Sequence, residues 1–450
     1  MYKLAFKKFI LSKSVIPALI LFLAIGTISI FIGKQFLEKQ QQAVHAVKLL
    51  QREQIARNVE YNTGQFGLLM YYLKFAYIKP TEPIAALAIG QQDINTSVQY
   101  VNIRGLEAQR YDTDLNNPYH LQTGNFDLSF VILFLFPLLI VVFCFNCLSE
   151  EKEGGTWSLT QVQTKNPINV LLQKFAVRYW TVLGLLLVLL LSASCIIDIP
   201  FDKKLLFYSI ISILYITGWF AICWFVISLH KSSNMNALIL LSLWLFLCLL
   251  SPAAINNLLT ARYPVKNAYS MFLKQRDGYH TKWDVSPDST INAFFEHYPQ
   301  YKNYIWKNPK FNYMWFYSMQ QLGDDEALGE SRKMMNELNH RENLSRRIAY
   351  FLPTMHTQLA YTDIASTGLN EHLRFLDSTA IFHEQKRLYF YPKIFGDSLI
   401  AAENWPKHQP QYYRNSISVS WFKMTVPFIL LIVLAAFGGR YFFAKHRYLG

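Results

Sequence analysis

Six apolar runs constrain this chain more than any other feature of its sequence. Each has roughly the 17–25 residues that a helix needs to cross the hydrocarbon of a bilayer. They lie at residues 15–33, 128–148, 179–197, 205–229, 237–255 and 419–443. Only the last contains charges, and its Lys423 and Arg440 lie near the ends, where long side chains reach the interface. Buried helices of a soluble protein would be shorter and would each show a polar stripe. The sequence therefore predicts a polytopic α-helical membrane protein with six transmembrane helices.

Basic residues predict the orientation of these spans. With six spans both termini lie on one side, and the loops on that side carry twelve lysines and arginines against three acidic residues. The first loop on the opposite side, residues 34–127, carries nine of each sign. Lysine and arginine near span ends favour the cytoplasm, so we expect both termini there. The net charge of +13 is then mainly a topology signal and requires no nucleic acid.

The chain ends also have predicted roles. Residues 1–14 place Tyr2, Phe6 and Phe9 at helical spacing beside lysines, which is typical of a cytoplasmic helix lying in the membrane surface. A merely basic flank to the first span is an equal alternative. No small-residue cleavage pattern follows the first span, which favours a retained anchor over a cleaved secretory signal. Residues 444–450 form the predicted cytoplasmic tail.

The first of two expected extracytoplasmic insertions covers residues 34–127. Its beginning, Gln35–Arg57, has one weakly apolar face, so we expect the first transmembrane helix to continue past the membrane. The region Tyr71–Gln99 is interrupted by proline and glycine, and we expect loops and short strands there.

The second insertion covers residues 259–418 and is large enough to form its own hydrophobic core. Ala327–Tyr350 and Gly368–Phe390 are predicted long helices, so this insertion should be mainly α-helical. Neither insertion contains a cysteine, and both must therefore fold without disulfides.

The cytoplasmic segment 149–178 carries the candidate functional residues. Its acidic residues offer charges to a basic partner, and its glycine pair permits a sharp change of direction that includes a positive φ at Gly155. The threonine is expected to cap a helix over Trp157–Gln163. An ordinary solvated acidic loop is the alternative. The candidate residues are Glu150, Glu151, Glu153, Gly154, Gly155 and Thr156.

The order of spans and insertions, with acidic residues before Gly155-Thr156, resembles bacterial permeases of the type 2 ABC exporter family. A second match, Asn343–Arg347 through Leu352-Pro353 and then Thr362–Gly368 and His372–Phe375, resembles the uncharacterised external domain of a subgroup of these permeases. The family more usually has a small-residue Gly-Thr where Ser366-Thr367-Gly368 stands, and serine where Leu352 stands.

The resemblance implies a permease subunit in the bacterial cytoplasmic (inner) membrane. Such a subunit would pair with itself or with a sister permease, and it would bind a separate ABC ATPase through the segment around Glu151. The insertions would shape an exit path or dock an envelope protein. The chain has no G-x-x-x-x-G-K-[ST] phosphate loop, so energy would come from the partner.

Two other classes of function compete with transport. The scattered histidines show no H-E-x-x-H zinc motif, and no G-x-S-x-G elbow occurs, so we expect neither an enzyme nor a bound metal or cofactor. A membrane-anchored binding or sensory protein stays open, with the insertions as its receptor. The longest predicted cytoplasmic segment has only about 30 residues, too few for a signalling domain.

Overall fold

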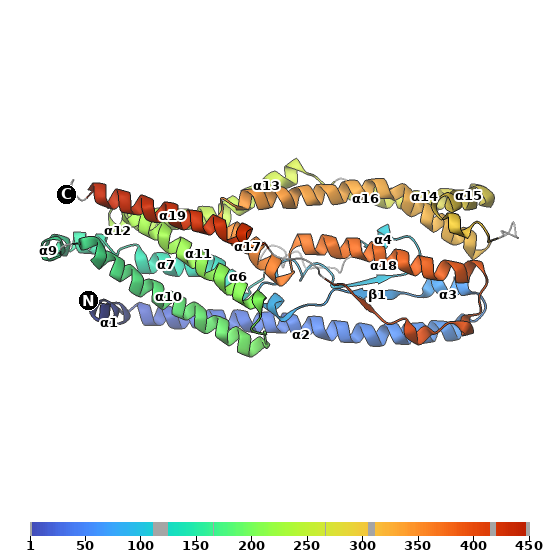
Figure 1. The fold of residues 1–450 in the computed structure, drawn as a ribbon, viewed down its shortest axis with the longest axis horizontal. Helices are drawn as coiled ribbons and strands as arrows, with labels where there is room; N and C mark the ends of the chain where they lie inside the picture. Colours follow the sequence, from blue (N-terminus) through green and yellow to red (C-terminus); the bar gives the residue numbers. More distant parts are fainter. Residues whose placement is uncertain are drawn as a thin grey trace.

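The protein is an elongated, mostly helical molecule with two parts (Figure 1). The computed structural model describes residues 2–110, 125–164, 166–265, 267–304, 311–414 and 420–446. One half is a bundle of long apolar helices, which we call the span bundle. The other half, the distal domain, is built from residues 34–110 and 267–414. Both chain ends lie at the end of the bundle far from the distal domain, together with α1 (Tyr2–Ile10) and α9 (Thr156–Gln163). We call this the turn end.

In the described part of the chain, six helices are long and apolar enough to cross a membrane, which agrees with the predicted polytopic helical class. Two of them are interrupted by π-helical turns, Val131–Leu135 and Phe246–Leu250. The spans are α2 (Val15–Tyr61), α6 with α7 (Leu128–Phe130 and Phe136–Cys144), α10 (Pro167–Ile197), α11 (Lys203–Ile227), α12 with α13 (Ser233–Leu245 and Ser251–Arg262) and α19 (Trp421–His446).

A proline explains the first π-helical turn. Pro137 has no N–H to give to the carbonyl of Leu133, and an unsatisfied carbonyl is costly in hydrocarbon. The hydroxyl of Tyr215 on α11 donates to that carbonyl at 2.7 Å. The indole of Trp244 on α12 donates to the next carbonyl, of Phe134, at 2.9 Å. The irregular turn therefore joins three spans.

The observed helix ends differ from the sequence boundaries in two places that matter for the site. The helix of the third span begins at Pro167, well before residue 179, so most of the predicted segment 149–178 is helical and the free turn is short. The fifth span continues to Arg262, past the expected start of the second insertion at residue 259. Apolar runs locate hydrocarbon, whereas helices extend into the interface wherever the backbone can bond internally.

Helix α2 is continuous for 47 residues, as expected from the weakly apolar face of Gln35–Arg57. Its far half belongs to the distal domain. The Gln51 side chain donates to the carbonyl of His408 at 2.7 Å and accepts from the amide of Ala76 at 2.6 Å. One buried amide thus fixes α2 to both insertions.

The distal domain contains a three-stranded sheet and a set of helices. In the sheet, β1 (Phe75–Ile78) lies between antiparallel β2 (Val98–Val101) and parallel β3 (Gln411–Tyr412), which confirms the short strands expected in Tyr71–Gln99. The main helices are α3 (Phe66–Tyr72), α4 (Glu107–Arg110), α14 (Asn267–His280), α15 (Pro287–His297), α16 (Tyr313–Ala349), α17 (Pro353–Ala365) and α18 (Leu369–Phe395). The two helices predicted in the second insertion are confirmed by α16 and α18, both longer than expected.

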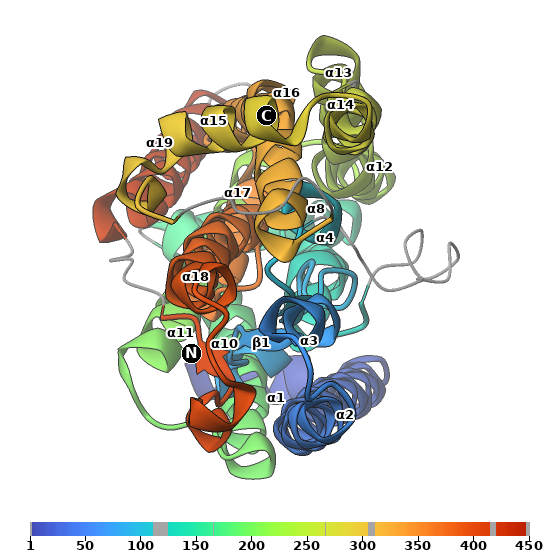
Figure 2. The ribbon, with the colours of Figure 1, turned by 90° about the vertical axis from the view of Figure 1, so that its right-hand side faces the viewer.

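The expectation that the second insertion has its own core is wrong. Helix α18 lies between the sheet and α16 (Figure 1 and Figure 2). Tyr77 of β1 stacks on Phe375 and Phe382 of α18, with ring centroids 5.6 and 4.8 Å apart. Buried residues of both insertions form one aromatic core. Pairing between segments about 300 residues apart leaves no periodic signal in either one.

A buried ion pair reinforces this shared core. Arg387 on α18 lies 2.7 Å from Asp324 on α16 and donates to the carbonyls of Ile103 and Arg104. Asp324 also accepts from the amide of Leu106 at 2.8 Å. Each charge is met by several partners, so removing one side chain would leave the other charge buried and uncompensated, which is costly.

Helix α17, although part of the second insertion, packs against α11 in the span bundle. Tyr361 stacks on Tyr208 of α11 at 4.2 Å and shares a 2.7 Å hydrogen bond with Ser212. Thr354 lies 3.2 Å from the Tyr215 hydroxyl, at the middle of α11. The second insertion is therefore coupled directly to the spans.

Candidate functional site

The acidic turn is a helix-turn-helix at the turn end of the molecule. After α7, a short α8 (Ser149–Glu153) is followed by Gly154 and Gly155 and then by α9. Gly155 has φ +70°, a left-handed conformation that side chains other than glycine resist. The positive φ expected there is confirmed. No atom lies within 4 Å of where a Cβ would be, so the backbone angle and not space requires glycine.

Thr156 does not have the expected role. Gly155 occupies the N-cap position of α9, and Thr156 is the first residue of the helix. Its hydroxyl donates back to the carbonyl of Glu151 at 3.2 Å. Thr156 therefore ties the end of α8 to α9, because the left-handed glycine moves the cap one residue earlier than the sequence suggests.

The glutamates of the turn have partners within the chain. Glu151 forms an ion pair with Lys174 of α10. Glu153 accepts from both the backbone amide and the hydroxyl of Ser233, at 2.8 Å each, where α12 begins. A carboxylate at a helix N-terminus satisfies an otherwise unbonded amide. The turn is thus attached to α10 and α12, the third and fifth spans.

Helix α9 also presents an apolar surface that the charge pattern did not reveal. Leu159 is 59% exposed and Val162 is 87% exposed, one helical turn apart. Trp157, on the other face, is buried and packs edge-on against Phe443 of α19 at 6.3 Å. Two apolar residues three positions apart in an otherwise polar short helix were the available sequence signal.

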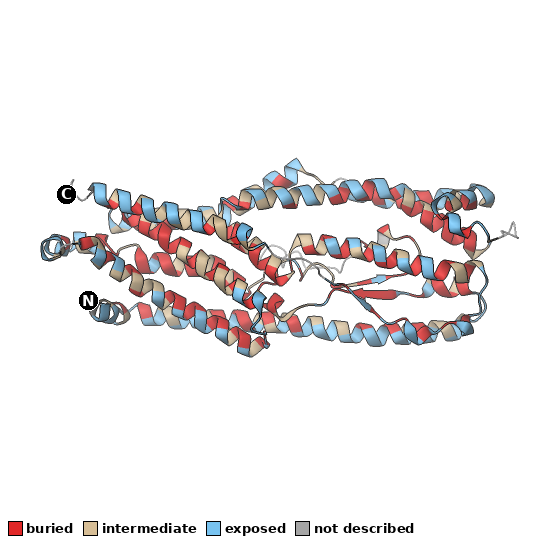
Figure 3. Ribbon diagram, viewed as in Figure 1, coloured by how far each residue is buried: buried red, intermediate tan, exposed pale blue. Residues whose placement is uncertain are grey.

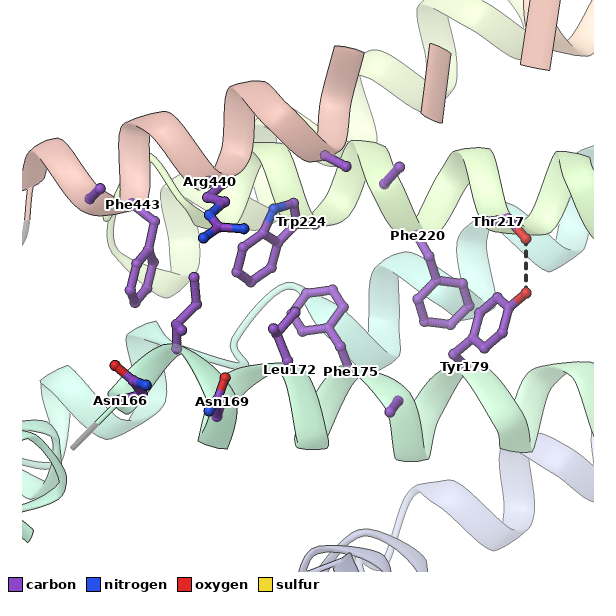
Figure 4. A pocket seen from close by; sticks show the side chains of 15 residues that line it. Asn166, Asn169, Leu172, Phe175, Tyr179, Thr217, Phe220, Trp224, Arg440 and Phe443 are labelled. Carbon is purple, nitrogen blue, oxygen red and sulfur yellow. Dashed lines mark hydrogen bonds between the residues drawn. The ribbon is translucent and has the colours of Figure 1, made fainter. Parts of the chain in front are cut away.

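A cavity of about 710 Å³ lies beside this turn, between α10, α11 and α19 (Figure 4). Arg440 extends into it from α19 above Trp224, and aromatic rings form the walls. Phe443 lines the cavity and stacks on Trp224 at 6.0 Å. Because Phe443 also touches Trp157, the wall of the cavity is in contact with α9. Among the described residues, no group of three or more histidine, cysteine, aspartate or glutamate side chains could hold a metal ion.

The second sequence match has a structural role at the junction of the two parts. Arg346 forms two bonds to Asp363, at 2.5 and 2.7 Å. Ser366 has φ +58°, a left-handed conformation that glycine adopts more readily than serine. Thr367 is buried and donates to the carbonyl of Ala88 in the first insertion at 2.7 Å. This motif therefore joins α16, α17 and the first insertion.

Comparison with known proteins gives one match. Residues 269–414 match a family model described as a domain of unknown function, DUF3526. No curated protein matches the chain. No solved structure matches it either. The matched segment runs from α14 to just past β3, and its core is completed by residues of the first insertion, which lie outside the match.

Proposed function

We propose that this chain is the membrane-spanning permease subunit of an ABC exporter, driven by ATP hydrolysis on a separate subunit. The observation that supports it best is the attachment of the acidic turn to its spans. Glu151 holds α10, Glu153 holds α12, and Trp157 contacts α19. A push on α9 would therefore reach three spans at once.

The docking element in this proposal is the exposed apolar face of α9. Leu159 and Val162 suit a shallow groove on an ATPase. The side chain of Glu150 is bonded only to the side chain of Asn146 among the described residues, so it can meet basic residues at the rim of that groove. The basic loops favour a cytoplasmic turn end in the bacterial inner membrane. The subunit would work as a dimer, with itself or a sister permease.

The test separates docking from transmission. Leu159→Asp with Val162→Asp should abolish co-purification of an ATPase from the native membrane in mild detergent, because charge replaces the apolar contact. Gln161→Asp, on the same helix, is the matched control and should retain the partner. Glu153→Gln should keep the partner but lower transport-coupled ATP hydrolysis, because it weakens the bond to α12.

The proposal would be abandoned if the wild-type protein brings down no nucleotide-binding subunit. It would also fail if the Leu159/Val162 double variant keeps full coupled hydrolysis. The anchored-receptor alternative would then explain the chain better.

A further inference from the structure

Two adjoining cavities lie where the distal domain meets the span bundle. The first, which we call the junction cavity, has a volume of about 580 Å³ and polar walls that include Lys204, Arg347 and Lys423. The second, the α19 groove, has a volume of about 510 Å³ and is lined mainly by apolar side chains of α19 and of the α16–α17 turn. Tyr350, His356 and Lys423 line both. The two cavities therefore share one wall, with charged side chains on one side of it and apolar side chains on the other.

The junction cavity has more positive charge than its own carboxylates balance. Lys204 pairs with Glu82 at 2.5 Å, and Arg346 pairs with Asp363. The third carboxyl, Glu371, is buried and lies near Lys79, whose charge opposes the rise that burial causes in the pKa of Glu371.

Two cations remain. The side chains of Arg347 and Lys423 form no hydrogen bond or ion pair with the part of the chain that the structure describes, and both residues are exposed. Unpaired cations on the wall of a cavity favour an anionic ligand.

The α19 groove has the position and length of an acyl-chain site. Phe422 and Leu434, which line it, are 75% and 72% exposed, so the groove opens onto the face that would meet lipid. From Lys423 to Leu434 the helix rises about 16 Å, roughly half the hydrocarbon thickness of a bilayer. The apolar wall of the groove thus begins at the unpaired Lys423 and is about as deep as one leaflet.

We propose that the junction cavity and the α19 groove together bind one lipid with an anionic headgroup, and that such a lipid is the cargo of the exporter. Arg347 and Lys423 contact the headgroup, and the acyl chain lies along α19. The identification as cargo rests on the proposed function, whereas the binding site does not. The cavity at the turn end has the same composition, with Arg440 of α19 above apolar walls, about 26 Å along the same helix. Helix α19 thus has, near each membrane face, an apolar site with a cation at its end.

The test uses full-length protein in mild detergent and measures retained lipid by native mass spectrometry. The probes are phosphatidylglycerol and phosphatidylcholine with the same acyl chains. We expect the wild type to prefer phosphatidylglycerol by roughly thirtyfold, as two interfacial charges would give. Arg347→Ala with Lys423→Ala should remove that preference. Arg332→Ala with Lys407→Ala removes the same charge from exposed positions that line neither cavity, and it should keep the preference.

Two further arms identify the ligand. Leu430→Trp should fill the α19 groove and lower the retention of both lipids. Glycerol phosphate, which is an anionic phosphate without an acyl chain, should not displace phosphatidylglycerol at equal concentration. Displacement by glycerol phosphate would show a small-anion site, and an unchanged preference in the Arg347/Lys423 variant would show that the headgroup binds elsewhere. Either result overturns the proposal.

A second copy of the chain is the competing occupant of the groove. If Leu434→Cys forms a disulfide-linked dimer in membranes that the wild type does not form, the groove is an interface and the proposal fails. The cargo claim is tested in the complex with its ATPase, where phosphatidylglycerol should stimulate ATP hydrolysis in the wild type but not in the Arg347/Lys423 variant. Lipid binding without any ATPase partner would refute the proposed function alone, whereas an ATPase partner without lipid preference would refute this inference alone.

Discussion

In the distal domain, buried rings and a buried ion pair join distant parts of the chain, whereas the span bundle leaves three of its helices largely uncovered (Figure 3). The apolar windows of α2, the α12–α13 span and α19 are only 22%, 17% and 17% buried. Those of the α6–α7 span and α11 are 67% and 72% buried. Apolar surface of this extent faces lipid or another subunit. The distal domain thus buries its core within one chain, whereas the bundle leaves apolar surface for lipid or another subunit.

The largest expected effect comes from separating what the distal domain joins. An isolated segment of residues 262–416 should show no cooperative thermal unfolding by circular dichroism, because Phe375 and Phe382 lose Tyr77 and α17 loses the span bundle. This reverses the expectation from length alone. The full-length protein in detergent is the control and should melt cooperatively. A sharp transition in the isolated segment would show that the second insertion has its own core after all.

A smaller but still severe effect should follow from Asp324→Ala. Removing one partner leaves Arg387 buried without a counter-charge, which costs about 3–5 kcal/mol of unfolding free energy. Glu326 lies on the same helix as Asp324 and forms an exposed pair with Lys282. Glu326→Ala should therefore cost less than about 1 kcal/mol of unfolding free energy. Denaturant titrations of the two variants measure the difference. Equal effects would mean that the buried pair does not hold the two insertions together.

Acid should weaken the distal domain through its buried histidines. Burial lowers the pKa of His383 well below its ordinary value and the pKa of His372 to about 4. The unfolded chain therefore binds protons below about pH 6.5 while the folded chain does not, so stability is complete above that pH and falls as the pH drops toward 4.

Melting temperatures between pH 7 and pH 5 measure this loss. At pH 5, His372→Gln should reduce this acid-induced loss of unfolding free energy by an amount on the order of 1 kcal/mol. His45→Gln, at an exposed position on α2, should leave the slope unchanged. An identical slope in all three proteins would rule out His372 as a contributor.

The smallest expected change in stability is at the turn end. Gly155→Ala forces a side chain into the left-handed region and should cost about 1 kcal/mol. Gly184→Ala also finds no atom within 4 Å, but it lies in helix α10, where alanine is favoured by about 1 kcal/mol. Opposite shifts in melting temperature are expected for the two variants. Shifts of the same sign would show that the turn does not depend on the backbone angle of Gly155.

Local features of the sequence were enough to find the spans and the turn. The six apolar runs, the long helices of the second insertion and the glycine at the turn all follow from composition over a few residues. The cap at Gly155 and the apolar pair Leu159 and Val162 were missed because an acidic run dominates the same segment. The partners of Glu151 and Glu153 were not predictable, since Lys174 lies in the next span and Ser233 begins the third span further along the chain.

By itself the sequence determined that this chain has six apolar helices, a glycine-dependent turn and two long insertions, because the bilayer and the backbone impose these locally. Only the tertiary structure decided that the insertions share one core, that α17 enters the span bundle, and that Arg347 and Lys423 border the same cavity. Some of these contacts join residues more than 300 positions apart. Their stability comes from burial and charge pairing after the chain has closed on itself, and no local pattern records them.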